Sequence, residues 1–161
     1  MTTSNGSLEY RSRLQSWKTA RCLYYGGELL KKHSTDFLTR RQKEPAEVYT
    51  ERIAASYYEN YIGSIIDWYI AALFRREPVI VLDESEFATS GVASRFIENC
   101  DRNRTSIAEF FRIVLRDAML FGHVFVLMDF PPMDGMAGTR ADEVALGTDI
   151  PYLILCSPEQ V

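Results

Sequence analysis

Three side chains of this sequence have the types needed for nucleophilic catalysis: Cys156, His123 and Asp129. A thiol beside an imidazole can act as nucleophile and base when a third group orients the ring. The even spacing of His123 and Asp129 places both on one face of a predicted strand, and Cys156 lies on a second predicted strand. No residue can be named that would orient the imidazole. The preferred interpretation of His123 is therefore a polar residue at a helix-to-strand corner.

Other chemistry-bearing patterns are absent from the sequence. It contains no nucleophile elbow, phosphate-binding glycine loop, zinc-protease motif or EF-hand. Cys22, Cys100 and Cys156 are odd in number and widely separated, which predicts free thiols in a reducing compartment rather than disulfides or a zinc site. We expect no catalytic, cofactor-binding or metal-binding residues and no enzymatic activity.

Composition and charge describe an ordinary globular chain. Its 161 residues are 47% hydrophobic and 25% charged, which predicts one domain with a core. A net charge of −4 and a pI of about 5.3 argue against a surface that neutralises a phosphate backbone. The basic clusters are interpreted as solvated turns; they are Lys31-Lys32, Arg40-Arg41 and Arg102-Asn103-Arg104. Residues 1–7 lack the apolar stretch of a signal peptide, and we expect them to be disordered.

A long amphipathic segment follows Pro45, which occupies a typical first helical position. From residue 46 to residue 76 only Gly63 weakens the helical pattern, which predicts one helix about 45 Å long. Its broad apolar face carries the aromatic residues that we expect to make interactions: Tyr57, Tyr61, Trp68 and Tyr69. The apolar run is shorter than the roughly 20 residues of a membrane span. The segment is predicted to be a buried or subunit-facing helix.

The same aromatic stripe has a second interpretation, as a stacking platform for nucleic acid. Four acidic residues on the helix weigh against it: Glu47, Glu51, Glu59 and Asp67. Packing against neighbouring helices or subunits is therefore preferred.

The remaining elements follow from caps, breakers and periodicity. Helical spacing that includes Trp17 predicts a helix from residue 8 to Gly26-Gly27, followed by a short helix or a loop over 28–39. A capping box at Ser106 and Glu109 starts a helix that ends at Gly122, where a left-handed conformation is expected. A buried strand over 123–128 and an exposed loop over 131–147 follow.

Three shorter elements complete the predicted fold. They are a strand at 79–82 after Pro78, a short helix within 92–100, and a final strand at 152–156 between two prolines. Residues 83–91 are predicted to form a loop. We expect an α+β fold, mainly helical, with a long central helix and a few short strands. We also expect the chain to continue beyond Val161, because nothing caps the final strand.

Several short patterns, separated by unmatched residues, follow one another along the chain. They are Tyr10, Trp17, Arg21 and Tyr25-Gly26-Gly27; Tyr49-x-x-Arg52, Ala55 and Tyr58-x-Asn60-Tyr61; Phe74-Arg75-Arg76-x-Pro78; Ser106, Phe110, Leu115 and Phe121-Gly122; Val126-Leu127-Met128-Asp129-Phe130-Pro131; and Pro151-Tyr152-Leu153 with Ser157-Pro158-Glu159-Gln160-Val161. In this combination the chain resembles the N-terminal portion of tailed-bacteriophage (prophage) portal proteins over roughly residues 8–161.

The resemblance implies a structural role. Portal proteins form a dodecameric ring at one capsid vertex, through which terminase pumps DNA and from which DNA later leaves. Residues 8–161 would form much of the outer wing, and the stem and clip would follow residue 161. The implied partners are further copies of the chain, capsid protein, terminase and a head–tail adaptor, with weak or no direct DNA contact from this segment and no membrane. The implied location is the virion or the host cytoplasm.

Two alternatives from other classes stay open. One is a non-viral helical protein-interaction domain, and the other is an enzyme fragment that lacks its active site.

Overall fold

The computed structural model describes residues 8–81, 91–132 and 138–160. Residues 1–7, where we expected disorder, lie outside this range, as does nearly all of the loop predicted at 83–91. The described chain is mainly helical with one pair of antiparallel strands, which confirms the α+β class. Composition predicts one domain, whereas the structure divides into two compact units, Met1–Tyr69 (unit 1) and Ile70–Val161 (unit 2).

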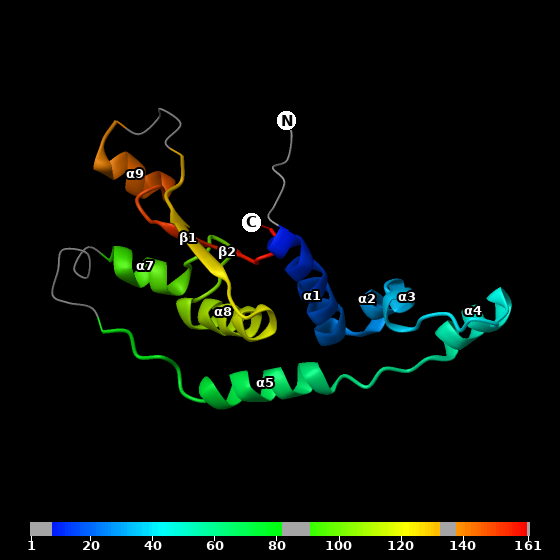
Figure 1. Cartoon of the computed structure of the whole chain (residues 1–161). Helices are drawn as coiled ribbons and strands as arrows, with labels where there is room; N and C mark the ends of the chain where they lie inside the picture. Colours follow the sequence, from blue (N-terminus) through cyan, green and yellow to red (C-terminus); the bar gives the residue numbers. More distant parts are fainter. Residues whose placement is uncertain (1–7, 82–90, 133–137, 161) are drawn as a thin grey trace. The chain divides into compact units, whose positions relative to one another are not determined.

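Unit 1 consists of short helices (Figure 1). They are α1 (Leu8–Tyr25), α2 (Gly27–Lys32), α3 (Ser34–Phe37), α4 (Ala46–Ala55) and most of α5 (Tyr61–Leu73). Helix α1 ends as predicted, because Gly26 adopts a φ of 58° that favours glycine. Trp17 is buried in α1 and makes an edge-to-face contact with Tyr10 at a centroid distance of 5.7 Å. The segment predicted as a short helix or a loop forms two short helices.

The predicted continuous helix over residues 46–76 is wrong. Helix α4 ends at Ala55, and Ser56 adopts an extended conformation with φ −71° and ψ 139°. Helix α5 then starts anew after Asn60, whose side-chain oxygen accepts a hydrogen bond from the Gly63 amide at 2.8 Å. This is the interaction of a helix N-cap, for which Asn is among the preferred residues. The apolar periodicity of the sequence continues across the break, but the helical conformation of the backbone does not.

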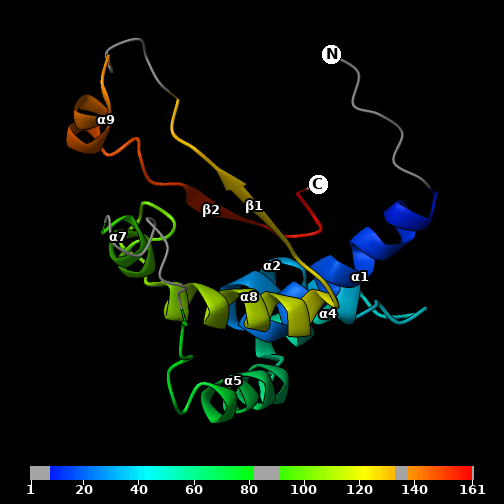
Figure 2. The ribbon, with the colours of Figure 1, turned by 90° about the vertical axis from the view of Figure 1, so that its left-hand side faces the viewer.

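Unit 2 places helices against a two-stranded sheet. After the end of α5, it contains α7 (Val92–Glu98), α8 (Ile107–Phe121), β1 (Phe125–Asp129), α9 (Arg140–Leu146) and β2 (Tyr152–Cys156). Figure 2 shows β1 and β2 side by side. Their antiparallel register pairs Phe125 with Cys156 and Asp129 with Tyr152. The core contains Cys100, Ile107 and Phe110, against which pack Phe96, Ile97, Val114, Leu153 and Leu155.

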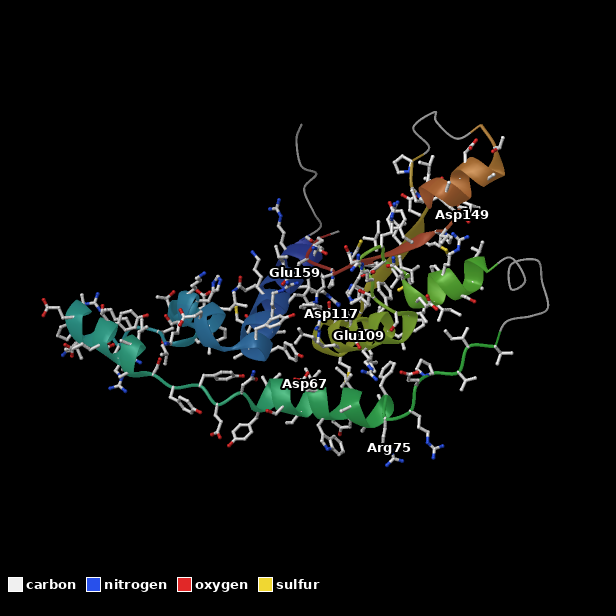
Figure 3. The ribbon with its side chains drawn as sticks, turned by 180° about the vertical axis from the view of Figure 1, so that it is seen from behind. Asp67, Arg75, Glu109, Asp117, Asp149 and Glu159 are labelled. Atoms are coloured by element: carbon white, nitrogen blue, oxygen red, sulfur yellow. The ribbon has the colours of Figure 1, made fainter. Side chains whose placement is uncertain are left out.

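Polar contacts tie the parts of unit 2 together. The Arg95 guanidinium on α7 donates to Asp149 at 2.6 Å, and Figure 3 labels Asp149. At the start of α8 the Ser106 hydroxyl accepts from the Glu109 amide, while the Glu109 carboxylate lies 3.4 Å from Arg112. At its end Gly122 has φ 85° and ψ −21°, which confirms the left-handed conformation expected there.

Three expectations for unit 2 need correction. Val79, Ile80 and Val81 lie in no strand, and Leu82 falls outside the described residues. The loop predicted at 131–147 contains α9, because Thr139 and Asp142 form a capping box and Gly147 adopts a left-handed C-cap. The strand predicted as buried starts at Phe125, and all five of its residues are exposed, because the core of unit 2 packs against β2, through Leu153 and Leu155, rather than against β1.

Candidate interaction surface

The junction between α1 and α5 decides which side of α5 faces its own unit. The Asn60 side-chain amide donates to the Tyr24 carbonyl at 2.5 Å, and the Tyr58 hydroxyl donates to the Leu23 carbonyl at 2.8 Å. These bonds satisfy carbonyls at the C-terminal end of α1, which have no helical partner of their own. About two turns further along α5, Asp67 accepts a hydrogen bond from the Tyr24 hydroxyl at 2.6 Å, and Figure 3 labels the position of Asp67.

Gly63 permits the close approach at this junction. A Cβ at this position would lie 2.7 Å from the Asn60 amide nitrogen and 3.0 Å from the Tyr24 carbonyl oxygen. Real Cβ atoms essentially never come within 3.0 Å of another heavy atom. The side of α5 that carries Gly63 and Asp67 is therefore held against α1 by contacts that a larger residue would disrupt.

The other sides of α5 form an exposed surface without charge, which we call the α5 surface. Its residues in unit 1 are 38% to 65% exposed; they are Tyr61, Ile62, Ile65, Trp68 and Tyr69. Trp68 and Tyr69 meet edge to face at a centroid distance of 5.1 Å. Asp67 is the one charged residue within the helix. A helix that is apolar on nearly all sides is normally buried, so this surface is suited to binding another apolar surface.

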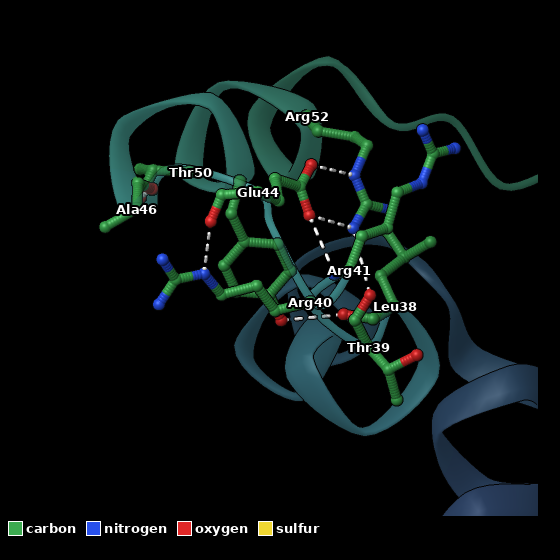
Figure 4. A network of polar contacts seen from close by, with 9 residues as sticks. Leu38, Thr39, Arg40, Arg41, Glu44, Ala46, Thr50 and Arg52 are labelled. Atoms are coloured by element: carbon green, nitrogen blue, oxygen red, sulfur yellow. Dashed lines mark hydrogen bonds and ion pairs between the residues drawn. The ribbon is translucent and has the colours of Figure 1, made fainter.

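A second polar network orders the region before α5 (Figure 4). The Arg52 guanidinium donates to both carboxylate oxygens of Glu44, at 2.8 and 2.9 Å, and the Arg41 amide donates to the same group at 3.0 Å. These hydrogen bonds lower the pKa of Glu44 to about 2. The Tyr49 hydroxyl donates to the Leu38 carbonyl, and Arg52 stacks over the Tyr49 ring. Tyr49 and Arg52 are thus engaged in holding α4 to the preceding loop.

Unit 1 also contains an open apolar cleft of about 450 Å³. Its walls come from α1, α2, α3 and the segment between α4 and α5, and include Leu23, Leu30, Phe37, Leu38 and Tyr57. Lys31 and Ser34 contribute polar groups. The Lys31 ammonium lies 3.7 Å from Glu28 at an exposed position.

The residues considered for nucleophilic catalysis do not come together. The antiparallel register places Cys156 opposite Phe125 and Asp129 opposite Tyr152, at the two ends of the strand pair. His123 precedes β1 and contacts the Phe125 ring edge to face at 5.4 Å. Asp129 accepts a hydrogen bond from the amide of Phe130, its neighbour in sequence. Asp129 therefore lies at the opposite end of the strand pair from Cys156, where it cannot orient a base beside that thiol.

Cys100 lies in the core of unit 2 and is fully buried. Burial, together with the nearby Asp101 carboxylate, raises the pKa of its thiol to about 11. The thiol is therefore neutral at physiological pH, and a neutral thiol is a poor nucleophile. Across residues 8–81, 91–132 and 138–160 no group of three or more His, Cys, Asp or Glu side chains is placed to hold a metal ion. Within the same ranges no helix combines the length and apolar character needed to cross a bilayer.

The residues predicted to make interactions fall into three groups. Tyr57, Tyr61, Trp68 and Tyr69 are all exposed, Trp17 is buried inside unit 1, and Gly122 serves the backbone at the end of α8. Sequence reasoning named Asn60 only within the pattern of the resemblance and missed its role as the N-cap of α5. The signal was present, because an Asn directly before an apolar run is typical of an N-cap. Comparison of the sequence with protein-family models and with curated proteins found no match.

Proposed function

We propose that this protein is a structural subunit that assembles with further copies of itself, and specifically a portal subunit of a tailed bacteriophage or prophage. The observation that carries the proposal is the α5 surface. It is apolar, uncharged and exposed in the single chain, while the polar groups near it are engaged in the α1–α5 junction. Such a surface suits a permanent protein contact better than a site of turnover.

The size of the surface supports an assembly role. An aromatic side chain contributes about 150–250 Å² when fully covered, so the exposed fractions of Tyr61, Trp68 and Tyr69 together amount to roughly 350 Å². Ile62 and Ile65 extend this area. The total lies within the range of the largest apolar patches of monomeric proteins, about 300–600 Å². It is a substantial part of the roughly 800 Å² that one partner contributes to a stable interface.

The portal assignment itself rests on the resemblance, to which the junction adds a physical reason. Tyr58 and Asn60, two residues of the matching pattern, hold the end of α1 next to Gly26, and Tyr49 and Arg52, two others, order α4. The protein would then act in a ring at the capsid vertex, as part of the outer wing, with capsid protein, terminase and a head–tail adaptor as partners of the ring. DNA would pass through the ring without strong contact to this segment, to which the net charge of −4 is suited. Its location would be the virion or the host cytoplasm, and its role would require no catalysis or cofactor.

The assembly role is tested by mass measurement on matched variants. Trp68→Ser and Tyr61→Ser remove apolar area from the exposed surface, whereas Glu59→Ala changes an exposed residue just before it. Light scattering coupled to size exclusion should show an oligomer for the wild type and for Glu59→Ala, and a smaller species for the two serine variants. Identical masses for all four proteins would refute the assignment of this surface.

A further inference from the structure

Strand β1 has an open edge. The described sheet contains two strands, so β1 pairs with β2 along one side and with no described strand along the other. The backbone amide of Leu153 on β2 donates to the Cys100 carbonyl at 2.6 Å, so this amide points away from β1. Leu153 and its partner on β1, Met128, therefore form a pair without mutual hydrogen bonds. The backbone groups of Met128, and of Val126 two residues earlier, then point to the open edge of β1.

The side chains of β1 are also exposed. Phe125, Val126, Leu127 and Met128 are between 45% and 60% exposed. An unpaired apolar edge readily accepts another strand. A third strand along this edge would satisfy the outward-facing backbone groups of β1.

The chain also carries a strand-forming segment without a sheet. Val79, Ile80 and Val81 have the β-branched side chains that favour strands, yet they lie in no strand, and Val79 and Val81 are 88% and 87% exposed. Figure 1 shows the chain after α5 as coil. Five residues before the segment, the Phe74 carbonyl accepts a hydrogen bond from Arg112 of α8 at 3.5 Å.

We propose that Val79–Val81 of one copy adds to the open edge of β1 in a second copy as a third, antiparallel strand. The inference rests on the proposed function, in that the second copy is the neighbouring subunit. Antiparallel addition directs Arg75 and Arg76, which precede the segment, toward the end of β1 that carries Asp129, so opposite charges meet. Addition in the parallel sense directs them away from it.

The geometry of donor and acceptor suits a ring. Each copy carries one donor segment and one acceptor edge, and these are different surfaces of the molecule. A contact between two different surfaces is heterologous, and its repetition generates a closed ring when the rotation between copies permits. Strand addition of this kind gains affinity from main-chain hydrogen bonds and specificity from alternate side chains.

Cross-linking tests the pairing directly. Ile80→Cys and Leu127→Cys are made separately in a Cys156→Ser background, because Cys156 lies on the adjacent strand and is partly exposed. Under mild oxidation the mixed single variants should form a disulfide-linked dimer, and the double variant should form a ladder of covalent oligomers. Absence of the mixed dimer would overturn the proposal. If the double variant instead closes its disulfide within one chain, the open edge of β1 pairs with the segment of the same chain. That result would also overturn the proposal.

Proline substitution provides a second readout. Ile80→Pro and Val81→Pro remove successive amides, so one of them removes a hydrogen bond to β1 whichever alternate residue faces the edge. At least one of the two should weaken self-association at least about tenfold, with circular dichroism unchanged because the segment lies in no strand, while Ile80→Val behaves as wild type. Wild-type association of both proline variants would refute strand addition and leave the subunit proposal intact. A wild-type protein that stays monomeric would refute both.

Discussion

Gly63→Ala should destabilise unit 1, although helix propensity predicts the opposite. Replacing Gly by Ala inside a helix ordinarily stabilises it by about 1 kcal/mol. Here the added methyl group would lie 2.7 Å from the side-chain nitrogen of Asn60 and 3.0 Å from the backbone oxygen of Tyr24. The Asn60 side chain must move, because the Tyr24 carbonyl belongs to the end of α1 and is far less free to shift.

The size of the effect follows from the bonds that Asn60 makes. Loss of its N-cap bond to the Gly63 amide costs about 1 kcal/mol, and loss of its bond to the Tyr24 carbonyl costs about another 1 kcal/mol. The propensity gain offsets about half of this total. We therefore expect Gly63→Ala to lower the free energy of unfolding of unit 1 by about 1 kcal/mol.

Urea unfolding followed by tryptophan fluorescence measures this change, since both tryptophans, Trp17 and Trp68, lie in unit 1. Asn60→Ala provides the matched background. Once the Asn60 side chain is removed, the closest contact of the new Cβ disappears, and Gly63→Ala should become neutral or stabilising. Stabilisation by Gly63→Ala in the wild-type background would refute the close approach at the junction.

The remaining predictions concern the exposed surface, a backbone cap and an ion pair. Trp68→Ala should weaken self-association about tenfold or more while it changes the folding of the single chain little, because Trp68 is 65% exposed; sedimentation velocity measures this, with Glu59→Ala as the control. Gly122→Val should lower the free energy of unfolding by about 1–2 kcal/mol in thermal melts, because φ at this position is 85°, while a Cβ added there would meet nothing within 4 Å, so the loss is conformational. Glu44 has a folded pKa of about 2 and an ordinary value of 4.5, so its stabilisation of unit 1 is present above about pH 4.5 and is lost as the pH falls toward 2. Acid titration followed by circular dichroism should show this loss in the wild type and a flatter profile in Glu44→Gln.

Local signals predicted much of the fold. Helix α1 ends at its glycine, α8 runs from its Ser106 cap to its Gly122 terminator, and β2 occupies the residues expected between two prolines. In each case the information lies within a few residues of the boundary, where caps and breakers act directly on the backbone. Helix α9 was also predictable from Thr139, Asp142 and Gly147, but its surroundings of glycine and acidic residues suggested a loop.

The errors arose where contacts distant in sequence decide the outcome. The break between α4 and α5 depends on Tyr58 and Asn60 reaching carbonyls of α1, 35 and 36 residues earlier, which the apolar periodicity of the segment does not reveal. For β1, an apolar run predicts that the strand is covered, but the pattern does not say whether the same chain or another provides the cover. The candidate interaction surface was likewise predicted in part. The sequence identified its aromatic residues, but only the contacts between α1 and α5 show which side of α5 is exposed.

Negative-stain electron microscopy of the gene product, purified at full length, is the direct test of whether this chain is a subunit of a ring. We expect closed rings with a central hole in the wild type and their loss in Trp68→Ser, while Glu59→Ala still forms rings. A monodisperse monomer over a range of protein and salt concentrations would contradict the claim that this chain is a subunit of a ring.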